Sequence, residues 1–343
     1  MSTNTSSKPK PINLALQGGG AHGAFTWGVL DTILEDERVE IEAISGTSAG
    51  AMNAVVLADG MMEGGREGGR RALEAFWVAV GRAALASPLK RSVWDMLTGN
   101  WSLDFSPSYL FFDLLSRVAS PYQLNPLNLN PLRDLVLQQV NFERLHRCDC
   151  IKLFISATSV RTGKVKVFKH AELSVDAVMA SACLPLLFQA IEIDGEAYWD
   201  GGYMGNPVLF PFFYRCRYPD IVIVQINPLE HEDIPTTAPE IMDRVNEITF
   251  NSSLISEFRA IDFVARLLDQ GALDPKRYKR VLLHIIYADQ RLGALTASSK
   301  FNAEWAFLRH LHQMGRAAAS EWLDRHFGSI GERSTVNVRS LFT

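Results

Sequence analysis

The segment Gly-Thr-Ser-Ala-Gly at residues 46–50 restricts the fold of this chain more than any other part of the sequence. Residues 40–44 before it are mostly apolar and partly β-branched, which predicts a short strand. Residues 51–58 after it are rich in Ala, Val and Leu, which predicts a helix. Glycines on both sides of Ser48 permit a sharp turn, because a tight elbow leaves no room for Cβ atoms. In this context the pattern G-x-S-x-G predicts a strand-to-helix turn that presents Ser48 as a nucleophile at the end of a sheet.

A glycine-rich turn follows the first predicted strand. Residues 12–16 are apolar except for Asn13, QGGGAHG occupies residues 17–23, and residues 24–34 have the composition of a helix. Backbone N–H groups in a glycine turn at the start of a helix can bind an anion. Beside an activated serine, such N–H groups form an oxyanion hole. The glycines at residues 18–23 also match G-x-G-x-x-G, so a nucleotide-binding role for the same loop is an alternative prediction.

A third segment, YWDGGY at residues 198–203, follows a strand-like run at residues 190–193. Asp200 precedes Gly201 and Gly202, and two glycines leave its carboxylate with little steric cover. The segment is consistent with a plain Asp-Gly-Gly loop or with a carboxylate that serves the predicted nucleophile.

Taken together and in this order, the three segments resemble the patatin-like phospholipase family, whose pattern is a G-G-G-x-x-G loop, a G-x-S-x-G elbow and a late D-G-G or D-G-A. Residues 125–132 (NPLNLNPL) and 180–185 (ASACLP) are similar to family segments as well, and the resemblance spans residues 11–224. It implies an α/β fold of three layers, with a central mostly parallel sheet flanked by helices and a helical, aromatic-rich insertion. It also implies a lipid acyl hydrolase of the phospholipase A or lysophospholipase type, with no metal or organic cofactor.

The resemblance assigns a role to each motif. It implies a Ser–Asp dyad in which Ser48 is the nucleophile that carries an acyl-enzyme intermediate and Asp200 is the base. An aspartate with an ordinary pKa near 4 is a weak base, and burial would make it a stronger one. The implied glycine positions are Gly18, Gly19 and Gly20 in the oxyanion hole, and Gly23, Gly46, Gly50, Gly201 and Gly202 in support of the loops and the elbow.

None of the eight histidines is assigned as the base. His22 lies inside the glycine loop and could point at a substrate, but the family places no base at this position. The other seven histidines lie in polar, strand-like or helical segments and are expected to be structural or exposed.

Composition narrows the class of protein. With 343 residues and 47% hydrophobic content, the chain can bury a large core. Its 34 basic and 38 acidic residues are balanced and form no basic tract, which argues against nucleic acid as a partner. Four cysteines without C-x-x-C spacing predict free thiols in a reducing compartment and no zinc site.

The predicted organisation is one large domain with two tails. Residues 1–10 read as a disordered tail without the apolar core of a signal peptide, and no apolar run is long enough to span a bilayer. We therefore expect a cytoplasmic protein that can contact a membrane peripherally. Residues 11–327 form the acyl hydrolase domain, with a cap-like insertion at 60–147 and a helical part at 240–327, and residues 328–343 form a C-terminal tail. Further strand-like segments occur at residues 151–157, 165–168, 221–226 and 281–286.

The insertion is rich in aromatic residues and contains no clear strand. Its first part, GGREGG at residues 64–69, predicts a flexible loop. Aromatic side chains such as Trp94 and Trp101 could line an acyl site or touch lipid at a membrane or micelle interface, since their rings combine an apolar face with a polar edge. They could equally pack the insertion onto the sheet. The oligomeric state is not predicted, and a catalytically silent lipid-binding module is a further alternative to an enzyme.

Overall fold

Eight strands form one mixed sheet in the computed structural model, which describes residues 8–230, 234–288, 292–293 and 295–343. The strand order is β5-β6-β3-β2-β1-β7-β8, and β4 pairs with β3. Five neighbouring strands run parallel, in the order β3, β2, β1, β7 and β8. Strands β4, β5 and β6 extend the sheet beside β3 in antiparallel pairings. The strands are β1 (Lys10–Leu16), β2 (Val39–Gly46), β3 (Lys152–Ser159), β4 (Val165–Lys169), β5 (Ile191–Ile193), β6 (Glu196–Asp200), β7 (Asp220–Val224) and β8 (Leu282–Ile286).

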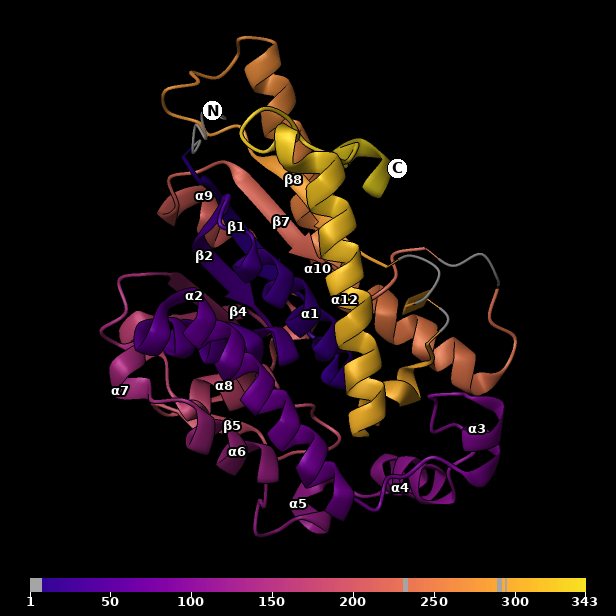
Figure 1. The fold of residues 1–343 in the computed structure, drawn as a ribbon. Helices are drawn as coiled ribbons and strands as arrows, with labels where there is room; N and C mark the ends of the chain where they lie inside the picture. The colour runs from indigo at the N-terminus through magenta and orange to yellow at the C-terminus, as the bar shows by residue number, and fades with distance from the viewer. Residues whose placement is uncertain (1–7, 231–233, 289–291, 294) are drawn as a thin grey trace.

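Helices cover both faces of this sheet (Figure 1). One core joins the sheet to α1 (Gly23–Glu35), α2 (Ala49–Ala83), α8 (Val175–Ser181) and α12 (Trp305–His326). A second core joins the opposite face to α9 (Phe210–Arg215) and α10 (Ala238–Asp269). The predicted fold class, a mostly parallel sheet flanked by helices, is therefore confirmed.

The central position of β1 brings the predicted motifs together. Its residues from Ile12 to Leu16 are fully buried, as expected for a parallel strand covered on both faces. Leu16 pairs with Gly46 of β2 on one side and with Val224 of β7 on the other. The glycine loop after β1 and the serine turn after β2 therefore leave the sheet side by side, at its carboxyl edge.

Helix α2 is longer than the sequence predicts. Residues 66–69 are helical instead of forming a flexible loop, whereas Gly64 and Gly65 depart from helical φ and ψ angles and form a kink between two helical parts of α2. The physical reason is Arg66, whose guanidinium donates hydrogen bonds of 2.6–2.8 Å to four backbone carbonyls between residues 33 and 39. These contacts anchor the glycine-rich stretch to the end of α1.

The rest of the insertion is a chain of short helices. Some begin at identifiable caps: Ser92 and Asp95 form a capping box on α3, and Ser106 caps α4 ahead of a proline. That residues 60–147 form a separate cap-like insertion stays a prediction. The helices are α3 (Val93–Thr98), α4 (Pro107–Val118), α5 (Pro121–Leu124), α6 (Pro131–Gln139) and α7 (Phe142–Leu145).

Parts of both predicted tails are ordered in the structure. Lys10 already belongs to β1, and residues 1–7 of the predicted N-terminal tail lie outside the described residues. The C-terminal residues 328–343 pack against the sheet: the Thr335 N–H donates to the Leu283 carbonyl at 3.0 Å, and the Gly331 N–H donates to the Asp220 carboxylate at 2.9 Å. The chain thus remains folded almost to its last residue.

The cysteines correct one prediction. Cys148 and Cys150 are joined by a disulfide, while Cys183 and Cys216 are free and buried. The chain turns between α7 and β3, and the Cα atoms of Cys148 and Cys150 lie 5.4 Å apart. This separation suits a disulfide. The spacing of the two cysteines in the sequence does not reveal the turn. Among the described residues, no helix combines the length and apolarity needed to cross a bilayer.

Candidate active site

Ser48 occupies the turn between β2 and α2. Its backbone has φ 54° and ψ −120°, a conformation that non-glycine residues rarely adopt and that concentrates at functional sites. The turn is closed by contacts that exclude a larger residue at Gly50, where a Cβ atom would overlap the Leu16 carbonyl oxygen. The Ser48 N–H donates a hydrogen bond of 2.9 Å to Ser181 Oγ. The strand-turn-helix context predicted for residues 46–50 is present, with the serine held in a strained conformation.

Two strand pairings bring Asp200 to this turn. Gly46 pairs with Ile155 of β3, and Ala157 of β3 pairs with Asp200 at the end of β6. The Asp200 carboxylate is buried, with 1% of the residue exposed, and it accepts a hydrogen bond from the Gly202 N–H at 2.7 Å. Burial raises the pKa of Asp200 to about 7, against the smaller opposing effects of this hydrogen bond and of the neighbouring Ser48 hydroxyl. The carboxylate is therefore a stronger base than an exposed aspartate.

Side chains next to the two residues tie their loops together. The Thr47 hydroxyl lies 2.6 Å from Ser156 Oγ and donates to the Gly205 carbonyl at 2.7 Å, which links the serine turn to the loop after Asp200. The Thr158 hydroxyl donates to the Asp200 carbonyl at 2.8 Å. The relative position of Ser48 and Asp200 is thus fixed from both loops.

The glycine loop lies directly against the serine. A Cβ atom at Gly18 would lie 2.7 Å from the Ser48 Cβ atom, so only glycine fits there. The Gly18 N–H donates to Asn206 Oδ1 at 2.7 Å, so it is already engaged, in contrast to its predicted role as an oxyanion donor. Within the described parts of the chain, the N–H groups of Gly19 and Gly20 have no acceptor. These two donors remain available to a ligand.

Several neighbours of the site were missed by the sequence analysis. Ser181 belongs to the segment 180–185 that resembles the family, but its hydrogen bond to Ser48 carries no sequence signal. Asn206, Asn227 and Lys300 surround the glycine loop from three segments far apart in the sequence. Only the fold brings them to one place.

The histidine in the glycine loop is not positioned to act as a base. His22 is buried, and its Nε2 atom lies 2.7 Å from Ser299 Oγ. Burial, and to a lesser extent the nearby Lys300 charge, lowers the pKa of His22 to about 3. Across the described residues, no histidine hydrogen-bonds to Ser48 or Asp200.

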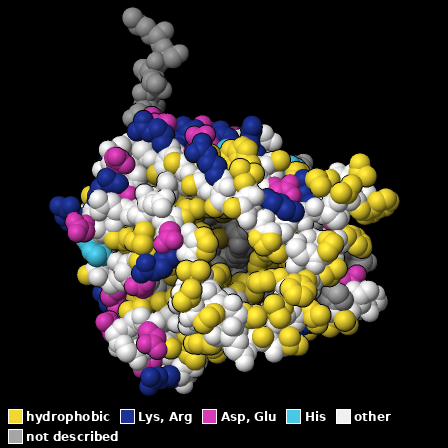
Figure 2. Space-filling model, turned by 90° about the horizontal axis from the view of Figure 1, so that it is seen from below, with side chains coloured by type: hydrophobic (Ala, Val, Ile, Leu, Met, Phe, Trp, Pro, Cys, Tyr) yellow, Lys and Arg dark blue, Asp and Glu magenta, His cyan; other side chains and the backbone are white. Residues whose placement is uncertain are grey.

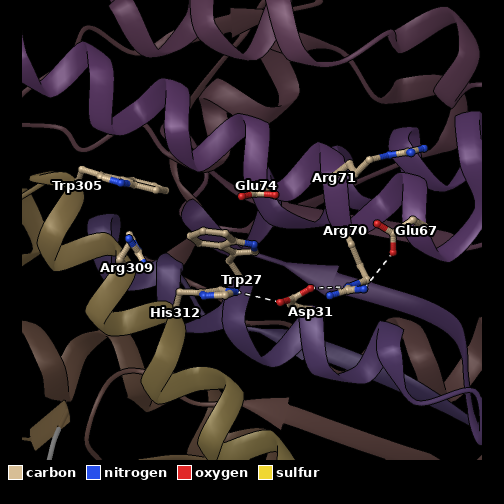
Figure 3. A pocket seen from close by; sticks show the side chains of 9 residues that line it. All are labelled: Trp27, Asp31, Glu67, Arg70, Arg71, Glu74, Trp305, Arg309 and His312. Carbon is tan, nitrogen blue, oxygen red and sulfur yellow. Dashed lines mark hydrogen bonds and ion pairs between the residues drawn. The ribbon is translucent and has the colours of Figure 1, made fainter.

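A separate cavity of about 420 Å³ lies between α1, α2 and α12 (Figure 3). The Asp31 carboxylate at its wall binds Arg70 at 2.6 Å, His312 at 3.1 Å and the Arg316 guanidinium. Burial opposes ionisation of Asp31, but these hydrogen bonds lower its pKa overall. None of the predicted site residues lines this cavity. We therefore interpret the ion pairs of Asp31 as contacts that stabilise the packing of α1, α2 and α12.

In the described residues, no group of three or more His, Cys, Asp or Glu side chains could hold a metal ion. The site thus consists of a strained serine, a buried aspartate and two free backbone donors on a three-layer α/β fold. The family model for patatin-like phospholipases matches residues 14–213, which include all three motifs. The chain belongs to the patatin-like phospholipase family, and this membership supports a lipid hydrolase activity.

Comparison with solved structures finds distant similarity. VipD from Legionella pneumophila is 15% identical with a TM-score of 0.41, over 93% of this chain and 67% of VipD. The type III effector ExoU is 16% identical with a TM-score of 0.36, over 93% of this chain and 54% of ExoU. ExoU in complex with SpcU from Pseudomonas aeruginosa gives 15% identity and a TM-score of 0.38, over 94% and 53% of the two chains. The chain thus spans about half the length of ExoU. No curated protein sequence matches.

Proposed function

We propose that this protein hydrolyses acyl esters of lipids, phospholipids or lysophospholipids foremost, through a Ser48–Asp200 dyad. The observation that carries the proposal is the position of the Ser48 side chain next to a carboxylate that is buried in the protein. A serine hydroxyl is a poor nucleophile until a base accepts its proton. A buried aspartate whose pKa is about 7 is suited to this task near neutral pH.

The reaction proceeds in two halves. Ser48 Oγ attacks the ester carbonyl carbon while its proton passes to Asp200, and the resulting oxyanion accepts hydrogen bonds from the Gly19 and Gly20 N–H groups. The tetrahedral species collapses, the C–O bond to the alcohol breaks, and Asp200 returns the proton to the leaving oxygen. Water then attacks the acyl-enzyme, gives its proton to Asp200, and the fatty acid leaves as Ser48 regains the proton.

Substitution of the free donors is expected to impair catalysis. Gly20 has φ 58°, and a Cβ atom there would lie 2.5 Å from the Lys300 carbonyl oxygen, so Gly20→Val must displace the loop. We expect Gly20→Val and Gly19→Val to lower kcat for a short-chain ester by roughly 10²-fold, the effect of a lost oxyanion donor. Gly328→Val is the matched control, because a Cβ atom at Gly328 meets nothing within 4 Å and should leave kcat unchanged.

The same variants test the nucleotide-binding alternative. That alternative predicts tight binding of NADH or NADPH by the parent protein, measured by calorimetric titration, and loss of this binding in Gly19→Val. Nucleotide binding lost in Gly19→Val while ester hydrolysis stays unchanged would contradict the proposed role of the loop. The Gly18 N–H is engaged with Asn206 and the Gly18 carbonyl with Asn227, so fewer groups of the loop face a pyrophosphate than the motif alone suggests.

The substrate is proposed to be presented at a lipid interface. One end of the molecule carries α3, α4 and α5, and its surface has abundant apolar side chains around a central hollow (Figures 1 and 2). Large exposed apolar patches mark binding surfaces for proteins or membranes. The insertion is tied to the site: the Leu103 N–H donates to Ser298 Oγ at 2.8 Å, and Ser298 belongs to the short helix η5 (Ala297–Phe301) whose Lys300 carbonyl borders Gly20. The exposed apolar side chains of α3 and α4 are Val93, Trp94, Met96, Leu97, Leu110, Phe111, Leu114 and Val118.

Two tryptophans of the insertion provide a matched pair for testing this interface. Trp94 is 65% exposed, whereas Trp101 stacks on Phe307 at 5.1 Å and lies under the Arg91 guanidinium. We expect Trp94→Ala to reduce hydrolysis of phospholipid vesicles by roughly tenfold, because a large apolar side chain no longer enters the lipid. Its hydrolysis of a soluble short-chain ester and its melting temperature should be unchanged. Trp101→Ala should instead lower the melting temperature and both activities together.

The vesicle assay also decides between lipid contact and internal packing for the exposed residues. Equal losses on vesicles and on the soluble ester in Trp94→Ala, together with a lower melting temperature, would show that Trp94 packs inside the protein. The proposed interface at α3 would then be wrong.

A further inference from the structure

Two asparagine side chains hold the first peptide group of the glycine loop. The Gly18 N–H donates to Asn206 Oδ1 at 2.7 Å, and the Gly18 carbonyl accepts a hydrogen bond from Asn227 Nδ2 at 2.8 Å. Asn227 itself is buried and fixed, because Gln17 Oε1 accepts from its backbone N–H at 2.9 Å. Its side-chain amide therefore reaches the loop from a rigid position after β7.

The hydrogen bond to the Gly18 carbonyl has a consequence for the next N–H group. The carbonyl of Gly18 and the N–H of Gly19 belong to one peptide plane, and in a trans peptide they point in opposite directions. When Asn227 holds the carbonyl, the Gly19 N–H is turned away from Asn227 and cannot rotate independently. This N–H has no acceptor in the described parts of the chain, so it is free to donate to a ligand.

Lys300 and Gln17 fix which way the Asn227 amide faces. Lys300 Nζ lies 2.9 Å from Asn227 Oδ1, and an ammonium group can only donate hydrogen bonds. The amide oxygen therefore faces Lys300, and the amide nitrogen faces Gly18 and also donates to Gln17 Oε1 at 3.3 Å. Asp243 and Glu247 of α10 lie near Lys300 and favour its charged form, although burial lowers the pKa of Lys300 overall. Lys300 is thus linked to the glycine loop through the hydrogen bonds of the Asn227 amide.

We propose that Asn227, oriented by Lys300, is a positioning residue that aims the Gly19 N–H at the oxyanion formed on the Ser48 ester adduct. The inference rests on the proposed function, because it assigns a purpose to the loop only if the loop stabilises an oxyanion. It adds two residues that no motif contains. A hydrogen-bonded chain in a poorly hydrated site also polarises its members, so Lys300 should strengthen Gly19 as a donor.

The test uses variants at both positions and a reporter of the oxyanion. Asn227→Asp keeps the shape but removes the donor to Gly18 and places an oxygen against its carbonyl, while Asn227→Ala removes the whole amide. Lys300→Met removes the charge, and Lys300→Arg keeps it. For each variant we would measure kcat and KM with a soluble short-chain ester and the inhibition constant of an alkyl trifluoromethyl ketone, which forms an oxyanionic adduct with a serine. Melting temperatures report the fold.

For Asn227→Asp we expect kcat to fall by roughly 10²-fold, on the scale of a lost oxyanion donor, with KM changed by less than about threefold. Binding of the trifluoromethyl ketone should weaken in parallel with kcat across the series. Lys300→Met should lie between Asn227→Asp and the parent, and Lys300→Arg should recover most of the loss. A parallel loss in kcat and in ketone binding, with KM preserved, is not produced by a general loss of stability.

Asn13→Ala is the matched control. Asn13 is buried like Asn227 and donates to the Tyr218 and Asp220 carbonyls, but it does not touch the glycine loop. We expect it to lower the melting temperature while kcat and ketone binding stay near the parent values. An active parent whose Asn227 variants keep kcat and ketone binding, or lose them only as far as Asn13→Ala does, would overturn this inference alone. A parent that neither hydrolyses esters nor binds the ketone would overturn the proposed function as well.

Discussion

Replacement of Ser48 by alanine is expected to lower ester hydrolysis by roughly 10³-fold or more, because the reaction loses the atom that forms the acyl-enzyme. The melting temperature should change little, since the substitution removes one oxygen and leaves the backbone of the turn in place. The measurement is the steady-state hydrolysis of a soluble short-chain ester, with thermal unfolding followed in parallel.

Ser45→Ala is a suitable control for this experiment. The Ser45 hydroxyl is buried in β2, just before the turn that carries Ser48, and donates to the Val208 carbonyl at 2.7 Å, so its removal should cost stability and leave activity near the parent level. Activity of Ser48→Ala within about tenfold of the parent would contradict its assignment as nucleophile. Binding of phospholipid vesicles by a parent protein that shows no hydrolysis would favour the lipid-binding module.

Substitution of Asp200 by asparagine is expected to lower turnover about as far as Ser48→Ala does, because the shape is kept and the base is lost. Burial raises the pKa of Asp200 to about 7, and only the ionised carboxylate can accept the Ser48 proton. In the parent protein, kcat/KM should therefore fall as the pH drops below about 7 and level off above it. The measurement is a pH profile of the parent and of Asp200→Asn, in which this ionisation should be missing.

The double variant Ser48→Ala/Asp200→Asn tests whether the two residues act as one unit. Its activity should be little below that of either single variant, because removal of one member already disables the other. Losses that multiply would contradict the dyad. Substitution of any single histidine should leave most activity, and a histidine whose loss equals that of Ser48 would instead indicate a triad.

Much of the sheet and of the elbow could be predicted because their signals are local. Residues 12–16 are apolar except for Asn13, which is the pattern of a buried parallel strand, and glycines follow where the backbone makes sharp turns. The same reasoning located the serine turn at residues 46–50. The two glycines after Asp200 and the family pattern predict Asp200 as the candidate base.

The remaining features depend on contacts between distant segments. The burial that raises the pKa of Asp200 is produced by packing around β6, and the engagement of Gly18 requires Asn206 to approach it from 188 residues away. Arg66 orders the glycine-rich part of α2 through carbonyls of the preceding segment, which a composition-based prediction of a loop cannot take into account. The Cys148–Cys150 disulfide depends instead on a local turn, which the spacing of the two cysteines does not show.

The most direct test of Ser48 as a nucleophile activated by Asp200 is covalent labelling with an alkyl fluorophosphonate, mapped by mass spectrometry of the digested protein. The probe reacts with serines whose hydroxyl is activated by a base. We expect one labelled residue, Ser48, in the parent protein, strongly reduced labelling in Asp200→Asn, and none in Ser48→Ala. Labelling of a different serine, or undiminished labelling of Ser48 in Asp200→Asn, would contradict this assignment.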